Sequence, residues 1–97
     1  MRMTKAELVK SVSDAVGAGV SRRECAAVTD ALLAAIVDTL ERGESVDIRG
    51  FGIFKVRHLA ARMGRNPGTG EPVQIAARTS PVFRPSKAFR ERVNTGA

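Results

Sequence analysis

Residues 60–74, with the sequence AARMGRNPGTGEPVQ, most constrain how this chain can fold, because such a stretch cannot fill a packed core. Strand-like alternation on both sides of it predicts a long β-hairpin whose turn lies at residues 66–70. The ascending side carries Arg62 and Arg65. We interpret the segment from about residue 58 to 76 as a flexible arm, suited to gripping a nucleic acid and poorly suited to catalysis.

The short chain predicts a shared hydrophobic core. Its 97 residues allow one domain, residues 1–97, and 43% of them are hydrophobic. Without the arm, a body of roughly 80 residues remains, and a chain of that size buries only a modest fraction of its surface. We therefore expect the body to fold as an oligomer.

The charge is divided unevenly along the chain. Residues 1–48 hold six basic and eight acidic side chains, a balance of −2, whereas residues 49–97 hold ten basic and two acidic ones, a balance of +8; together these give the net +6. A basic half joined to a mildly acidic half is typical of a surface that faces a polyanion.

Two amphipathic helices are predicted in the first half. The sequences TKAE at residues 4–7 and SRRE at residues 21–24 are capping boxes, in which a hydroxyl and a glutamate satisfy backbone N–H groups at a helix start. Apolar residues follow each at helical spacing until Gly17 and Gly43. The result is a helical hairpin.

From residue 44 the apolar period changes to two, which predicts antiparallel strands with one apolar and one basic face. Phe54 and Val56 alternate with Lys55 and Arg57, and a similar alternation follows the arm. Proline at position 81 predicts an edge strand or a bulge.

A short last helix should begin after Ser86 and run to about residue 93, with Phe89 as its apolar anchor. The predicted fold class is α+β: a two-helix hairpin base, a three-stranded antiparallel sheet with a long β-hairpin arm, and a short C-terminal helix.

The outward basic residues of the sheet and of the arm should form one continuous cationic path: Arg57, Arg78, Arg84, Arg62 and Arg65. Neutralising phosphates releases counterions, so binding should be strong and salt-dependent. Arginine outnumbers lysine eight to two in this half, which suits the negative potential of narrow minor grooves.

Proline at position 67 has two compatible interpretations. It is a turn former after Asn66, and it is also an apolar wedge that could enter between stacked bases and kink a duplex. A wedge on a hairpin would have to sit at its turn.

Other kinds of site have little support. Cys25 is the only cysteine and lies on an apolar helix stripe, His58 is the only histidine, and Gly70 is followed by Glu71 where a P-loop needs lysine. No signal peptide or membrane-length apolar run is visible. We expect an intracellular, soluble protein that is not an enzyme, with no metal, cofactor, small-molecule substrate or membrane partner.

Three motifs carry a family resemblance: GFGIFKV at residues 50–56, GRNPGTGE at residues 64–71 and IAAR at residues 75–78. With the order of predicted elements, they resemble the bacterial histone-like family of HU and integration host factor over essentially the whole chain. The resemblance implies an intertwined dimer whose helices form the base and whose two arms wrap the minor groove of double-stranded DNA, with the proline that matches Pro67 intercalating. It also implies a cytoplasmic, nucleoid-associated protein that bends and compacts DNA.

Two sets of residues are therefore expected at interfaces. The DNA-binding set is Lys5, Lys55, Arg57, Arg62, Arg65, Asn66, Pro67, Arg78, Arg84 and Lys87. The dimer-core set is Leu32, Ile36, Phe51, Phe54, Phe83 and Phe89. We expect a homodimer, and a heterodimer with a paralogous chain remains an alternative.

The chain departs from HU-like arms at Leu59, Glu71 and Gln74, where basic residues are common in that family. Glu71 and the sequence FRP at residues 83–85 look more like integration host factor subunits. The expected function is low or shape-based sequence specificity, as in HU. The alternatives are a sequence-preferring integration host factor subunit and, more remotely, an RNA-binding basic hairpin protein.

Overall fold

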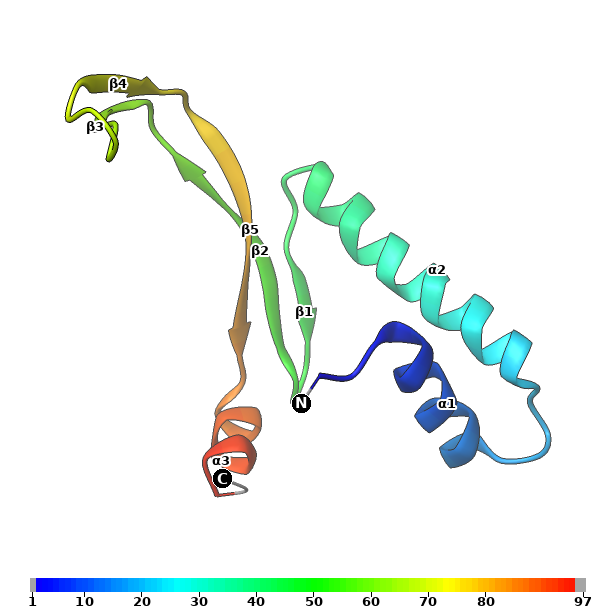
Figure 1. Ribbon diagram of the computed structural model, residues 1–97. Coiled ribbons are helices and arrows are strands. Elements are labelled where there is room, and N and C mark those ends of the chain that lie inside the picture. The colour runs from blue at the N-terminus through cyan, green and yellow to red at the C-terminus, as the bar shows by residue number, and fades with distance from the viewer. Residues whose placement is uncertain (1, 96–97) are drawn as a thin grey trace. The chain divides into compact units, whose positions relative to one another are not determined.

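The computed structural model describes residues 2–95 and divides into two units, Met1–Asp38 and Thr39–Ala97. Within the described residues, the first unit holds α1 and most of α2, and the second holds all of the strands and α3 (Figure 1).

Helix α1 (Lys5–Val16) begins at the predicted capping box. The Glu7 N–H donates to Thr4 Oγ1 at 3.3 Å, and the Thr4 N–H donates to Glu7 Oε1 at 3.2 Å. The helix ends at Gly17, whose φ of 92° lies in a region that side chains other than glycine rarely adopt.

Helix α2 (Arg22–Glu41) begins at the second predicted capping box. The Glu24 N–H donates to Ser21 Oγ, and the Ser21 N–H donates to Glu24 Oε1, both at 3.0 Å. These hydrogen bonds favour the charged carboxylate, so the pKa of Glu24 lies below its ordinary value of 4.5, mainly because of the backbone N–H of Ser21.

The first unit leaves most of its apolar surface uncovered. Among the described hydrophobic residues, Val9 and Cys25 alone are buried. The apolar stripe of α2 is largely open to solvent, and Leu32 on it is 56% exposed. A soluble monomer rarely exposes so much contiguous apolar surface, so a partner surface is needed to complete this core.

The second unit contains a three-stranded antiparallel sheet in the order β1-β2-β5. The strands are β1 (Val46–Ile48), β2 (Gly52–Leu59) and β5 (Arg78–Pro85). Pro81 lies in β5, an edge strand, as the sequence predicts.

The arm is a separate two-stranded ladder of β3 (Arg62–Arg65) and β4 (Pro72–Ile75). Residues 60–61 and 76–77, all alanine, belong to neither ladder. Figure 1 shows both ribbons bending there, between the long strands and the arm. The predicted hairpin is therefore confirmed, but its hydrogen-bonded ladder is interrupted at the root of the arm.

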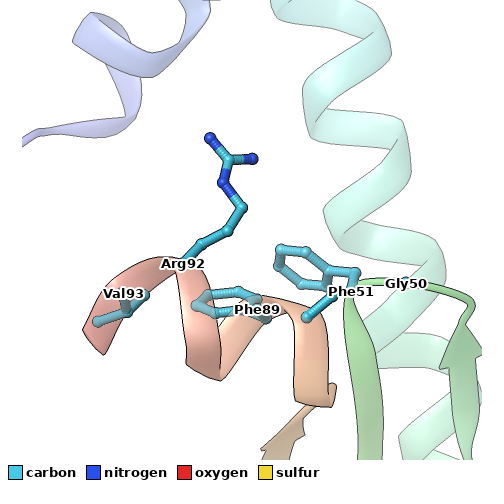
Figure 2. Close-up of a pocket in the computed structure, with 6 residues that line it drawn as sticks. Gly50, Phe51, Phe89, Arg92 and Val93 are labelled. Carbon is cyan, nitrogen blue, oxygen red and sulfur yellow. The ribbon is translucent and has the colours of Figure 1, made fainter. Parts of the chain in front are cut away.

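Four phenylalanines form a cluster beside α3 (Lys87–Thr95), a helix that runs slightly further than predicted. Ser86 caps this helix, since its Oγ accepts from the Phe89 N–H at 3.1 Å and donates to the Gly50 carbonyl at 2.9 Å. Figure 2 shows the Phe51 and Phe89 rings side by side, with Arg92 reaching away from the helix; the ring centroids are 5.1 Å apart. Phe51 remains 41% exposed, so the cluster is one half of a core.

Candidate nucleic-acid interface

The strand register gathers the predicted cations of the sheet on one face. In an antiparallel pair, directly opposite residues point to the same side. The pairs on this face are Ile53 with Arg84, Lys55 with Val82, Arg57 with Ser80 and Leu59 with Arg78. The four basic residues of these pairs define what we call the cationic face: Lys55, Arg57, Arg78 and Arg84.

The cationic face is not uniformly basic. Asp47 of β1 is paired with Ile53, which is itself paired with Arg84, so one carboxylate shares this side of the sheet. Ile53 and Val82 on the same side are half-buried. The positive charge is therefore concentrated toward Arg57 and Arg78, where the arm begins.

The register is the same on both sides of the interruption at the arm root. Leu59 pairs with Arg78 and Arg62 pairs with Ile75, so two residues are left out of each strand. Counting with a period of two through the four alanines, which lie outside both ladders, relates the cationic face to one side of the arm. We call this side the groove face; it carries Met63, Arg65, Pro72 and Gln74.

Arg62 lies on the opposite side of the arm. It is directly across from Ile75 and shares that side with Gly64 and Val73. Residues three apart on a strand face opposite ways, so Arg62 and Arg65 lie on opposite sides of the arm. That both bind DNA stays a prediction.

Hydrogen bonds fix the tip of the arm. The Gly68 N–H donates to Asn66 Oδ1 at 2.8 Å, and the Gly70 N–H donates to the Asn66 carbonyl at 2.7 Å. Arg65 closes the neck, since its Nη1 donates to the Gly70 carbonyl at 3.2 Å. Gly70 has a φ of 75°, which favours glycine there. Asn66 thus shapes the turn with the carbonyl of its side chain, in addition to its predicted contact with DNA.

Pro67 is exposed at this tip, between Asn66 and Gly68. Its ring fixes φ near the value that a turn requires, and it removes a donor that would otherwise need a partner. The tip therefore presents a rigid apolar ring to the outside, the geometry that a wedge requires.

The remaining two predicted contacts, Lys5 and Lys87, lie outside the cationic face. Lys5 is in the first unit, where its Nζ is 2.9 Å from Asp30 Oδ1. Lys87 begins α3, with its Nζ 3.9 Å from Glu91 Oε1. Both pairs are exposed, and ion pairs of this kind contribute little to stability, so either lysine can exchange its partner for a phosphate.

The predicted dimer-core residues retain exposure within one chain. The rings of Phe54 and Phe83 lie 4.7 Å apart and are half-buried, as are Phe89 and, in the first unit, Ile36. Together with the exposed parts of Phe51 and Leu32, these residues leave apolar surface uncovered within each unit.

Sequence reasoning missed Gln74 and Met63 as candidate contacts. They are paired across the arm and both are exposed on the groove face. Their position follows from the register, which depends on the length of the turn. A turn of four residues places Asn66 opposite Glu71. Counting back along the strands from that pair places Met63 opposite Gln74.

Within residues 2–95, no three His, Cys, Asp or Glu side chains are grouped so that they could hold a metal ion. None of the helices described is both long and apolar enough to cross a bilayer.

Comparison with known proteins identifies the family. A family model described as "Bacterial DNA-binding protein" matches residues 3–94. Integration host factor subunit alpha of Anaeromyxobacter dehalogenans is 45% identical over 94 residues, covering 97% of this chain and 81% of that protein. DNA-binding protein HU of Xylella fastidiosa is 44% identical over 95 residues, covering 98% of this chain and 99% of that protein.

Solved structures agree with the sequence matches. The structure titled "Anabaena HU-DNA cocrystal structure (AHU2)" superposes with a TM-score of 0.86 at 40% identity, covering 94% of this chain and 97% of that one. A family model over nearly the whole length and relatives above 40% identity leave one assignment: this chain belongs to the bacterial DNA-binding protein family of HU and integration host factor.

Proposed function

We propose that two copies of this chain lay duplex DNA across their cationic faces, insert both arms into the minor groove and bend the duplex with Pro67. The family consists of architectural nucleoid DNA-binding proteins, not enzymes, and its members function as dimers. We further propose the individual DNA contacts, the wedge and a cytoplasmic location.

The observation that carries the proposal is the register of the sheet, which puts Lys55, Arg57, Arg78 and Arg84 on one face of it. Arg65 adds a further cation beside the tip of the arm that follows. A run of guanidinium groups along one side can follow a phosphate backbone and then enter a groove whose potential attracts cations.

A dimer is supported by the incomplete core of the single chain. The exposed stripe of α2 and the partly exposed phenylalanine cluster both need cover. Two arms in one assembly also allow two wedges on one duplex. Bending DNA costs on the order of 1–10 kcal/mol, and the phosphate contacts of two subunits together with the wrapped surface can offset this cost.

The experiment that tests the wedge is Pro67→Ala. Energy transfer between dyes on the two DNA ends should report a smaller bend angle. The circular dichroism spectrum of the protein should stay unchanged, because the hydrogen bonds of the tip are made by Asn66 and Arg65 and not by Pro67. Pro81→Ala is the matched control, since it removes an exposed proline of β5 that pairs with Val56, on the side of the sheet away from the cationic face. An angle unchanged in Pro67→Ala, or reduced equally in both variants, would refute the wedge.

Sequence preference separates the two branches of the family. The relatives include both HU and integration host factor subunits at similar identity. We propose weak, shape-based preference as in HU. Selection from a pool of random DNA fragments should return them without a dominant motif, whereas an enriched motif would favour the integration host factor branch. A preference for RNA over bent or nicked DNA in a competition assay would contradict both.

A further inference from the structure

We infer that the root of the arm is a binding site for a small monocarboxylate with an apolar tail, the chemistry of a medium-chain fatty acid. A hollow of about 360 Å³ lies where the ladder of the sheet and the ladder of the arm separate, and we call it the arm-root pocket. Its lining comes from both ladders and from the alanines between them. Binding there would be a function beyond DNA bending, and recognition of the ligand does not require DNA.

The wall of the arm-root pocket is mostly apolar. It consists of Leu59 at the end of β2, Ile75 at the end of β4 and three of the four root alanines. Leu59 and Ile75 are half-buried, so each keeps part of its side chain available to a ligand. Gly64 makes room for Ile75, since a Cβ at this glycine would lie 2.7 Å from Ile75 Cδ1. Small-molecule sites typically combine an apolar wall of this kind with a few polar groups.

Two arginines supply the polar groups of the pocket. Arg62 begins β3 and Arg78 begins β5, and both are exposed and line the pocket. Counting through the alanines places them on opposite sides of the hairpin, but the ribbons bend at this point (Figure 1), and one pocket includes both. Each guanidinium presents several N–H donors in a planar fork that matches the two oxygens of a carboxylate.

The charges of these two arginines are not neutralised by the protein. Among the ion pairs and side-chain hydrogen bonds of residues 2–95, none involves Arg62 or Arg78, and no acidic residue of that range lines the pocket. The hollow between α1 and α2 differs in this respect, because Asp30 lines it and pairs with Lys5. Two like charges beside one apolar wall repel each other, and a bound anion would relieve that repulsion.

The apolar wall and the two cations together select the class of ligand. A phosphate group would meet the arginines but would bring no apolar surface to cover Leu59 and Ile75. An alcohol with a hydrocarbon tail would cover the wall but would leave both guanidinium charges without a counterion. A monocarboxylate with such a tail satisfies both requirements, because its oxygens accept hydrogen bonds from the arginines while its tail removes the wall from water.

Methyl NMR of the free, full-length protein locates the ligand and measures its affinity. Sodium octanoate should shift the methyl signals of Leu59 and Ile75 and leave those of Leu32, in the first unit, unchanged. Arg62→Gln and Arg78→Gln should each weaken octanoate binding by about 3- to 10-fold, the effect of losing one charge-assisted hydrogen bond at an exposed site.

Arg84→Gln is the matched control, because Arg84 is an exposed arginine of β5 that does not line the pocket, so the affinity for octanoate should not change. Octan-1-ol lacks the charge, and inorganic phosphate lacks the tail, so both should bind more weakly than octanoate. Phosphate binding as tightly as octanoate would reduce the pocket to a plain anion site, and octanol binding as tightly would remove the arginines from recognition. Either result would overturn the inference, as would shifts confined to Leu32 or an equal loss of affinity in Arg84→Gln.

Discussion

Arg57→Gln tests the cationic face most directly. Arg57 is exposed and lies across from Ser80, in the part of this face nearest the arm. Glutamine keeps most of the length of the side chain and can still donate hydrogen bonds, so the change removes the charge and little else.

The expected magnitude follows from the number of phosphates contacted. Each neutralised phosphate contributes about 0.9 to the slope of log K against log salt concentration. A dimer of two copies carries the substitution twice, so the slope should become shallower by about 1.8. If the two proteins bind equally near 1 M salt, the affinity at about 0.1 M salt should then fall roughly 60-fold.

Fluorescence anisotropy with labelled duplex at several salt concentrations measures this slope. Lys10→Gln is the control, because Lys10 is an exposed cation of the first unit that pairs with Asp14 at 3.5 Å. An unchanged slope in Arg57→Gln would remove the cationic face from the interface. An equal decrease in both variants would mean that net charge alone governs binding.

Two further predictions concern the fold. Leu32→Asp would bury a carboxylate in the proposed dimer core, where burial of each leucine side chain stabilises the dimer by about 1.5–3 kcal/mol. Sedimentation at micromolar concentration should therefore show dissociated chains, and a dimer of unchanged stability would contradict the shared core. Gly52→Ala would bring a Cβ to 2.6 Å from the Arg84 carbonyl oxygen and 2.7 Å from the Phe83 ring, which should lower the free energy of unfolding by about 1–3 kcal/mol in denaturant titrations. Gly19→Ala is its control, because nothing lies within 4 Å of that position, and an equal loss there would discount the steric argument.

The sequence predicted the elements well because their signals are local. Both capping boxes lie where hydroxyl and glutamate are three residues apart, α1 ends next to Gly17, and α2 ends two residues before Gly43. The two faces of the sheet also followed from alternation, since Lys55 and Arg57 have the same parity on one strand. These features depend on neighbours along the chain, and no distant contact could alter them.

The arrangement of the arm could be predicted only in part. The motif at residues 64–71 identified a tip, but which side each side chain takes depends on how many residues close the turn and on whether the strands stay in register through the root. For this reason Arg62 and Arg65 were expected on one path, whereas they lie on opposite sides of the arm. The size of the shared core likewise depends on a second chain, which no local pattern describes.

The four alanines between sheet and arm have a mechanical consequence. Their backbone amides are exposed and outside both ladders, so they should exchange hydrogen with solvent far faster than those of β2 and β5. Fewer hydrogen bonds hold the backbone at this joint than in the ladders on either side of it, so bending there costs less than bending a ladder. In the proposed complex, the joint would adjust the arm to duplexes of different curvature while the hydrogen-bonded tip keeps its shape.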